Sequence, residues 1–146
     1  MIQSTDNSFG KKHKLCNKIL LDALFEKGTA FFSYPFRCVY LITDREEDSE
    51  NVQIVVTVSK RNHKRAVSRN LIKRRIRESY RINKTLWLKK EDGQFIVPGK
   101  RLLIAFIYTS KDILDYKTIE NGVRRGIVTA CKNIEKNPDF SAGSGD

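Results

Sequence analysis

Residues 52–84 read VQIVVTVSKRNHKRAVSRNLIKRRIRESYRINK, and this stretch decides the fold. Its first seven residues are rich in β-branched side chains, which is typical of a strand. Further along, a mostly apolar stripe recurs at helical spacing and predicts a helix that docks on a sheet. The stripe consists of Ile72, Ile76, Ser79, Tyr80 and Asn83.

Nearly all of the net charge of the chain lies in residues 60–84. The whole chain carries 28 Lys and Arg against 17 Asp and Glu, a net charge of +11. This segment holds eleven basic residues and one acid, Glu78, a net charge of +10. A solvated helix face normally mixes both signs, and like charges at this density repel each other. The pattern therefore predicts a polyanionic partner.

The basic side chains of this helix form one contiguous arc beside the apolar stripe. Charges on a rigid scaffold lose less entropy on binding than charges on a tail, and the Arg fork pairs with phosphate oxygens. DNA, RNA and an anionic membrane would all satisfy the charge. A membrane-surface helix needs a broad apolar face, so the narrow stripe disfavours that partner. The arc consists of Lys73, Arg77, Asn70, Arg81 and Arg74.

The rest of the chain predicts one domain at residues 13–136, between flexible tails at 1–12 and 137–146. Apolar periodicity places a helix at 15–27, ended by Gly28, and another near 115–136. Strands are predicted at 36–42, 52–58 and 102–109, the last of them central. The first two are expected to pair antiparallel through an acidic loop at 44–50. The fold class is therefore α/β, an α+β sandwich in the order α-β-β-α-β-α, with helices packed on a sheet.

The cysteines and histidines give no sign of a metal site. Cys16, Cys38 and Cys131 are too widely spaced for a zinc motif, so we expect small buried hydrophobes in a reducing, cytoplasmic compartment. We expect His13 and His63 at the surface or beside phosphates. No apolar run reaches the 18 residues that a membrane span needs.

The first predicted helix carries a second apolar face. Six apolar positions should form the face toward the core: Leu15, Cys16, Ile19, Leu20, Ala23 and Leu24. Leu21 and Phe25 form an i, i+4 pair beside this face. A pair outside the main core face is a candidate contact site, although both residues could also be simple core.

Ser59 to Arg81 resembles the signature of the bacterial ribonuclease P protein subunit. Four pairs keep the spacing of that family: Ala66-Val67, Arg69-Asn70, Lys73-Arg74 and Arg77-Glu78. The stretch LLDALFEKGTAF at residues 20–31 resembles its first helix, and the whole resemblance covers about residues 10–135. Leu71 stands where the family motif has Arg, and Leu21 where it often has Phe, so one phosphate contact is expected to be absent.

The resemblance implies a subunit of a ribonucleoprotein endonuclease that removes 5′ leaders from precursor tRNA. Catalysis would reside in the RNA, which would also hold the Mg²⁺. It implies a mixed sheet with a left-handed β-α-β crossover, the catalytic RNA and precursor tRNA as partners, and neither a membrane nor an obligate protein partner. A cleft at the first helix and the adjoining sheet would hold the leader, at Leu21, Phe25 and Tyr40. The expected RNA-binding residues are Lys60, Arg61, Arg65, Arg69, Asn70, Lys73, Arg74 and Arg77.

Two other functions stay open at this point. A ribosomal or assembly protein could use the same helix to bind RNA without a leader cleft. A stand-alone hydrolase would need converging carboxylates for metal ions, but the acids are scattered along the sequence and Glu78 stands among cations. We therefore predict no catalytic residue and no metal bound by the protein.

Overall fold

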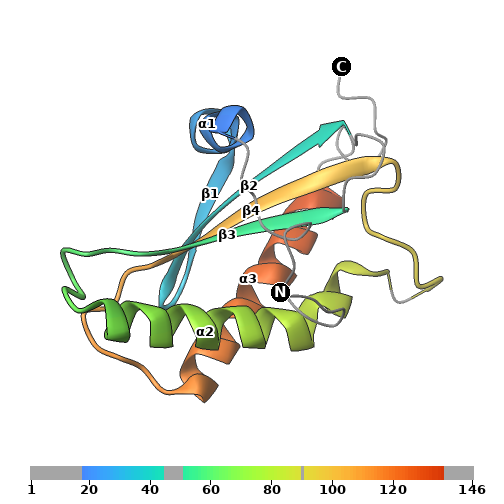
Figure 1. Cartoon of the computed structure of the whole chain (residues 1–146). Helices are drawn as coiled ribbons and strands as arrows, with labels where there is room; N and C mark the ends of the chain where they lie inside the picture. Colours follow the sequence, from blue (N-terminus) through green and yellow to red (C-terminus); the bar gives the residue numbers. More distant parts are fainter. Residues whose placement is uncertain (1–17, 45–50, 90, 137–146) are drawn as a thin grey trace, which may run out of the picture.

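The computed structural model describes residues 18–44, 51–89 and 91–136. The predicted tails, the start of the first predicted helix and most of the acidic loop lie outside these residues. The elements follow one another as a helix, three strands, a helix, a strand and a helix (Figure 1). They are α1 (Lys18–Lys27), β1 (Thr29–Ser33), β2 (Phe36–Asp44), β3 (Val52–Val58), α2 (Ala66–Asn83), the 3-10 helix η2 (Lys84–Trp87), β4 (Lys100–Tyr108) and α3 (Tyr116–Lys136).

The four strands form one mixed sheet in the order β1-β2-β4-β3. The pairs β1–β2 and β2–β4 are antiparallel, whereas β3 and β4 are parallel. The predicted antiparallel pairing of β2 with β3 is therefore wrong, because β4 lies between them. The prediction of a central strand is confirmed, and residues 101–106 of β4 are all buried.

The chain from β3 through α2 to β4 makes the β-α-β crossover that joins the two parallel strands. This confirms the predicted α+β class and the mixed sheet. The left-handedness of the crossover stays a prediction of the family resemblance.

The structure contains one more strand than the sequence predicted. The sequence of β1 is TAFFS, only five residues long, and it occupies an edge of the sheet. It pairs with β2 across a tight turn in which the Tyr34–Pro35 peptide bond is cis. A short strand directly after a helix shows too few residues for an alternating pattern, so the element order becomes α-β-β-β-α-β-α.

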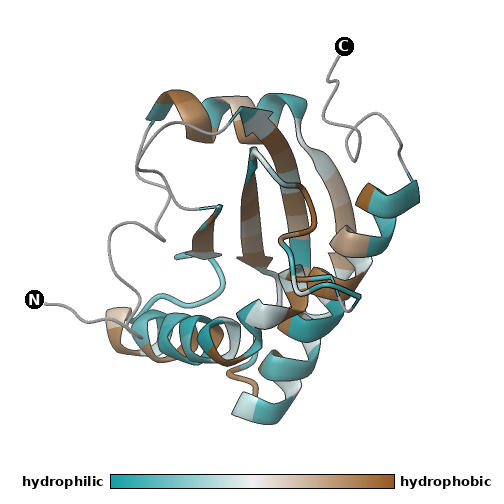
Figure 2. Ribbon diagram, turned by 90° about the vertical axis from the view of Figure 1, so that its right-hand side faces the viewer, coloured by the Kyte–Doolittle hydropathy of each residue, from teal (hydrophilic) through white to brown (hydrophobic). Residues whose placement is uncertain are grey.

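Helices cover the two faces of the sheet unequally. In Figure 1, α2 and α3 lie on one side of the sheet and α1 lies on the other. The larger core cluster fills the α2/α3 side and includes Phe36, Phe106, Ile76 and Ile127. Figure 2 shows mostly hydrophobic strands between helices in which hydrophilic and hydrophobic residues alternate. The smaller cluster, under α1, joins Leu24 with Val39, Leu103 and Ala105. Ile19, predicted on the same face as Leu24, is 77% exposed, so the prediction is wrong at that position.

Two glycines allow close approaches that position these layers. A Cβ atom on Gly28 would lie 2.7 Å from Cγ1 of Val39, so the chain can turn from α1 into β1 only without a side chain there. The prediction that α1 ends before Gly28 is confirmed. A Cβ atom on Gly122 would lie 2.7 Å from Cδ of Pro35, which shows how closely α3 packs on the β1–β2 turn.

Candidate nucleic-acid interface

The predicted apolar stripe of α2 docks as expected. Ile72, Ile76, Ser79 and Tyr80 are buried against the sheet and α3. The Asn83 amide donates to the carbonyl oxygen of Ser79 at 2.7 Å and to Oε2 of Glu120, on α3, at 3.1 Å. Helix α2 is thus held on two sides, which makes it a rigid support for the side chains on its remaining surface.

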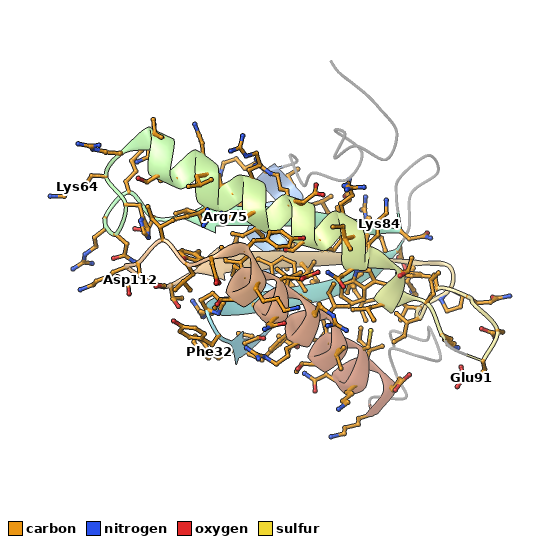
Figure 3. All side chains as sticks on the ribbon, turned by 90° about the horizontal axis from the view of Figure 1, so that it is seen from below. Phe32, Lys64, Arg75, Lys84, Glu91 and Asp112 are labelled. Carbon is orange, nitrogen blue, oxygen red and sulfur yellow. The ribbon has the colours of Figure 1, made fainter. Side chains whose placement is uncertain are left out.

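The basic arc (Lys73, Arg77, Asn70, Arg81 and Arg74) follows the docked stripe round α2, and its Arg81 lies near Tyr116 at the start of α3. Arg75, on the opposite flank, donates to the carbonyl oxygen of Leu114 just before α3. Figure 3 shows Arg75 midway along α2, with Lys64 and Lys84 near its two ends. Asn70 and Arg74 are exposed and Lys73 is half-buried. Burial lowers the pKa of Arg77 from its ordinary value.

Arg69 and Arg81, like Arg75, have partners inside the protein. Nη1 of Arg69 donates to the carbonyl oxygens of His63 and Lys64, at 2.8 and 2.9 Å. Arg81 pairs with Glu78 at 2.6 Å, which lowers the pKa of that carboxyl. Arg69 therefore shapes the segment before the helix, and any contact of Arg69 with RNA would use the rest of its guanidinium.

The segment that precedes α2, residues 59–65, is named here the basic turn. His63 anchors it: the ring is buried, its Nε2 lies 2.8 Å from the carbonyl oxygen of Ser110, and it packs beside Tyr108. The prediction that His63 lies at the surface is therefore wrong. Within the turn, Ser59 accepts hydrogen bonds from the backbone N–H groups of Arg61 and His63. The side chains of Lys60, Arg61, Lys64 and Arg65 are exposed around this anchor.

The side of the sheet that carries α1 is only partly covered. Leu21 is half-buried in the cluster under α1, whereas Phe25 is 50% exposed. Beyond α1, one residue from each strand forms a row across the sheet, paired as Phe32–Arg37, Arg37–Ile107 and Ile107–Thr57. Phe32, Arg37 and Thr57 are exposed. We name Phe25 and this row the open face.

Tyr40 does not belong to the open face, so the prediction that it lies with Leu21 and Phe25 is wrong. Alternation along β2 turns Tyr40 toward α3, on the opposite side of the sheet from Val39. The ring is 3% exposed, and its hydroxyl bonds with Thr29 and Asn133. Burial raises the pKa of Tyr40, as expected for a core residue.

Sequence reasoning missed the row of Phe32, Arg37, Ile107 and Thr57, of which Ile107 is half-buried and the others exposed. Alternation could have placed Arg37 on the same face of the sheet as Val39, two residues later in the strand. The pairing that brings the four residues together could not have been found from alternation, because it depends on strand order.

Among the described residues, no group of three or more His, Cys, Asp or Glu lies close enough to hold a metal ion. Asp44, the one acid of the predicted loop within the described ranges, pairs with Lys100 at 2.7 Å. Cys38 is buried and Cys131 half-buried, and neither forms a disulfide. None of the helices in the described ranges has the length and apolarity to cross a membrane.

Comparison with known proteins connects these features to one family. The family model Ribonuclease P matches residues 9–115. The chain is 31% identical over 124 residues to the ribonuclease P protein component of Porphyromonas gingivalis. This match covers 85% of this chain and 87% of the relative. It is 35% identical over 105 residues to that of Chlorobium phaeobacteroides, covering 70% and 72%.

Solved structures show the same fold. The RNase P protein of Staphylococcus aureus superposes with a TM-score of 0.57 at 19% identity, covering 81% of this chain and 94% of that protein. The RNase P protein from Thermotoga maritima superposes with a TM-score of 0.53 at 22% identity, and the match covers 83% of this chain and 96% of that protein. On the sequence matches, this chain belongs to the ribonuclease P protein family, the protein component of a tRNA-processing ribonucleoprotein.

Proposed function

We propose that the basic turn and the basic arc bind the catalytic RNA of ribonuclease P, while the open face holds the 5′ leader of precursor tRNA. The observation that carries this proposal is the placement of two different surfaces side by side. Thr57, at one end of the row, lies two residues before Ser59, where the basic turn begins. A substrate strand on the open face would therefore lie next to the RNA bound by the turn.

The basic turn and arc suit a folded RNA because their shape is preset. Hydrogen bonds through His63 and Arg69 hold the turn, and the docked stripe holds the helix. The turn and the helix lose little conformational entropy when RNA phosphates bind. Most of the electrostatic attraction between the cations and the phosphates therefore contributes to the binding free energy. Lys60, Arg61, Arg65, Asn70, Lys73, Arg74 and Arg77 are the residues that we assign to this contact, with Arg69 as their support.

The open face suits a single strand. Phe25 and Phe32 expose aromatic rings, which stack on unpaired bases with roughly 1–3 kcal/mol per base. Arg37, paired with Phe32 in the sheet, supplies a cation for the backbone of the strand. Leu21 would contribute through its half-buried side chain beside Phe25. A duplex offers no unstacked bases, so this face would favour the leader over the tRNA body.

In this proposal the RNA subunit performs the cleavage and holds Mg²⁺. The described residues offer no cluster of acids that fits the ion. The protein would bring two polyanions together, and its cations would screen their repulsion. The RNA should then retain its Mg²⁺ at lower ionic concentrations than it could alone.

Cleavage of precursor tRNA at low Mg²⁺ tests the proposal. The protein, the catalytic RNA and their mixture are assayed separately. We expect cleavage by the mixture and almost none by either part. Cleavage by the protein alone would support a hydrolase instead. Binding without stimulation of the RNA would support an assembly protein and overturn the proposal.

A further inference from the structure

A second cationic surface lies on α3. Five basic residues and two acids fall within Tyr116–Lys136. The near-neutral charge of the chain outside residues 60–84 concealed this surface, because acids elsewhere, five of them at 44–50, balance it. The exposed cations are Lys117, Arg124, Arg125, Lys132 and Lys136.

These cations divide between two sides of α3. On the side toward α2, Glu120 bonds with Asn83 and the Cys131 thiol with the carbonyl oxygen of Leu86. Helical geometry places Arg124, seven residues before Cys131, on that side. On the side toward β1, Nη2 of Arg125 donates to the carbonyl oxygen of Tyr34 at 3.0 Å.

Helical spacing places Lys132 and Lys136, seven and eleven residues after Arg125, on the β1 side as well. The stripe of Arg125, Lys132 and Lys136 therefore runs along the edge of the molecule next to β1. Two aromatic residues are exposed where this edge meets the sheet: Phe32 is 63% exposed and Tyr34 is 49% exposed. The next residue of β1, Ser33, donates its hydroxyl to the carbonyl oxygen of Gly122 on α3 at 3.0 Å, so this edge lies against α3.

The row across the open face joins the two basic surfaces. Its Thr57 end, on β3, lies beside the basic turn, and its Phe32 end, on β1, lies beside Tyr34 and Arg125. Cations are thus present at both edges of the sheet and, through Arg37, between them. A single strand that enters beside the basic turn would meet Arg37 within the row and Arg125 at the β1 edge.

We propose that the leader continues over the β1 edge onto α3, where Phe32, Tyr34, Arg125, Lys132 and Lys136 bind its part farthest from the tRNA. This rests on the proposed function, since it extends the same leader path. Aromatic rings among cations are the usual means of binding a single strand without sequence preference. A membrane would need a broad apolar face, which this edge lacks.

The test compares leader lengths in the assembled holoenzyme. Precursor tRNAs with leaders of roughly two and roughly ten nucleotides are bound to the wild type and to the double variant Arg125→Ala, Lys132→Ala. We expect the variant to lose roughly tenfold affinity for the long leader and almost none for the short one. The double variant Lys117→Ala, Arg124→Ala removes the same charge from the other side of α3 and should show no dependence on leader length.

If the Arg125→Ala, Lys132→Ala variant lost equal affinity for both leaders, or lost none, the proposal would be overturned. No loss would indicate that this surface binds a protein partner instead. Arg125→Lys keeps the charge without the guanidinium fork and should retain most of the long-leader affinity, which separates charge from folding. Phe25→Ala distinguishes this proposal from the proposed function, because it should weaken both leaders. A loss with Phe25→Ala but none with the α3 variant would overturn the extension alone.

Discussion

Nε2 of His63 lies 2.8 Å from the carbonyl oxygen of Ser110, across 47 positions of sequence. A carbonyl oxygen only accepts hydrogen bonds, so Nε2 carries the proton and donates. This bond ties the basic turn to the loop that precedes α3. The basic turn is thus held by a buried side chain that is not one of its exposed cations.

His63→Ala should weaken binding of the catalytic RNA without changing its dependence on salt. Loss of one buried hydrogen bond costs about 1 kcal/mol, or roughly fivefold in affinity, because the loosened turn must be ordered on binding. Binding titrations over a range of salt concentrations measure both quantities. Arg61→Ala is the control and should reduce the slope of log K against log salt. A reduced slope for His63→Ala would mean that the ring itself meets a phosphate.

Arg74→Ala should reduce the slope of log K against log salt by about one unit. Arg74 is an exposed cation of the basic arc, and without it RNA binding would release about one counterion fewer. With about six phosphate contacts, the wild-type slope should be roughly −4 to −5. Arg75→Ala removes the same charge one residue away. The guanidinium of Arg75, on the other flank of α2, donates to the carbonyl oxygen of Leu114. We therefore expect Arg75→Ala to leave the slope unchanged. An unchanged slope across several such substitutions would exclude the arc from the interface.

Phe25→Ala should weaken the binding of leader-bearing tRNA by roughly 1–3 kcal/mol and the binding of mature tRNA far less. Since half of the ring is exposed, its effect on the free energy of unfolding should stay below about 1 kcal/mol. Leu24→Ala, at the buried neighbouring position, should cost about 2–5 kcal/mol of stability. Tyr40→Phe should leave leader affinity unchanged. Equal losses for both tRNAs with Phe25→Ala would show that Phe25 acts as core.

Cys38 should make stability fall in alkaline solution. Burial raises the pKa of its thiol from 9.0 to about 12, so the unfolded chain loses this proton first. The contribution of the protonated Cys38 thiol to the free energy of unfolding is complete below pH 9 and is lost as the pH rises toward 12. Urea unfolding of the wild type and of Cys38→Ala, at pH 8 and at higher pH, measures this difference. If the two proteins lost stability in parallel, another group would be responsible.

The elements with strong local patterns were predicted from the sequence. The strand at 52–58 and the last helix near 115–136 agree with β3 and α3 to within a residue, and the docking stripe of α2 is the one observed. In each case apolar side chains recur with the period of one element, so the signal needs no partner. The edge strand β1 was missed because five residues are too few to show a period.

Strand order could not be predicted, because pairing is chosen among several apolar strands. The nearest strands in sequence, β2 and β3, were expected to pair, yet β4 inserts between them. Its run of buried residues can be satisfied only by neighbours on both sides and by helices on both faces. That requirement outweighs proximity in sequence, and it also determines which residues form the row across the open face.

The sequence by itself determined the basic helix, its docking stripe and its family, because charge and periodicity are properties of neighbouring residues. Only the tertiary structure decided which cations are available. It tied Arg69 and Arg75 to backbone carbonyls, buried His63, and turned Tyr40 away from Phe25. It also brought Arg125 to the β1 edge. These outcomes depend on contacts between residues far apart in the chain, which no local pattern contains.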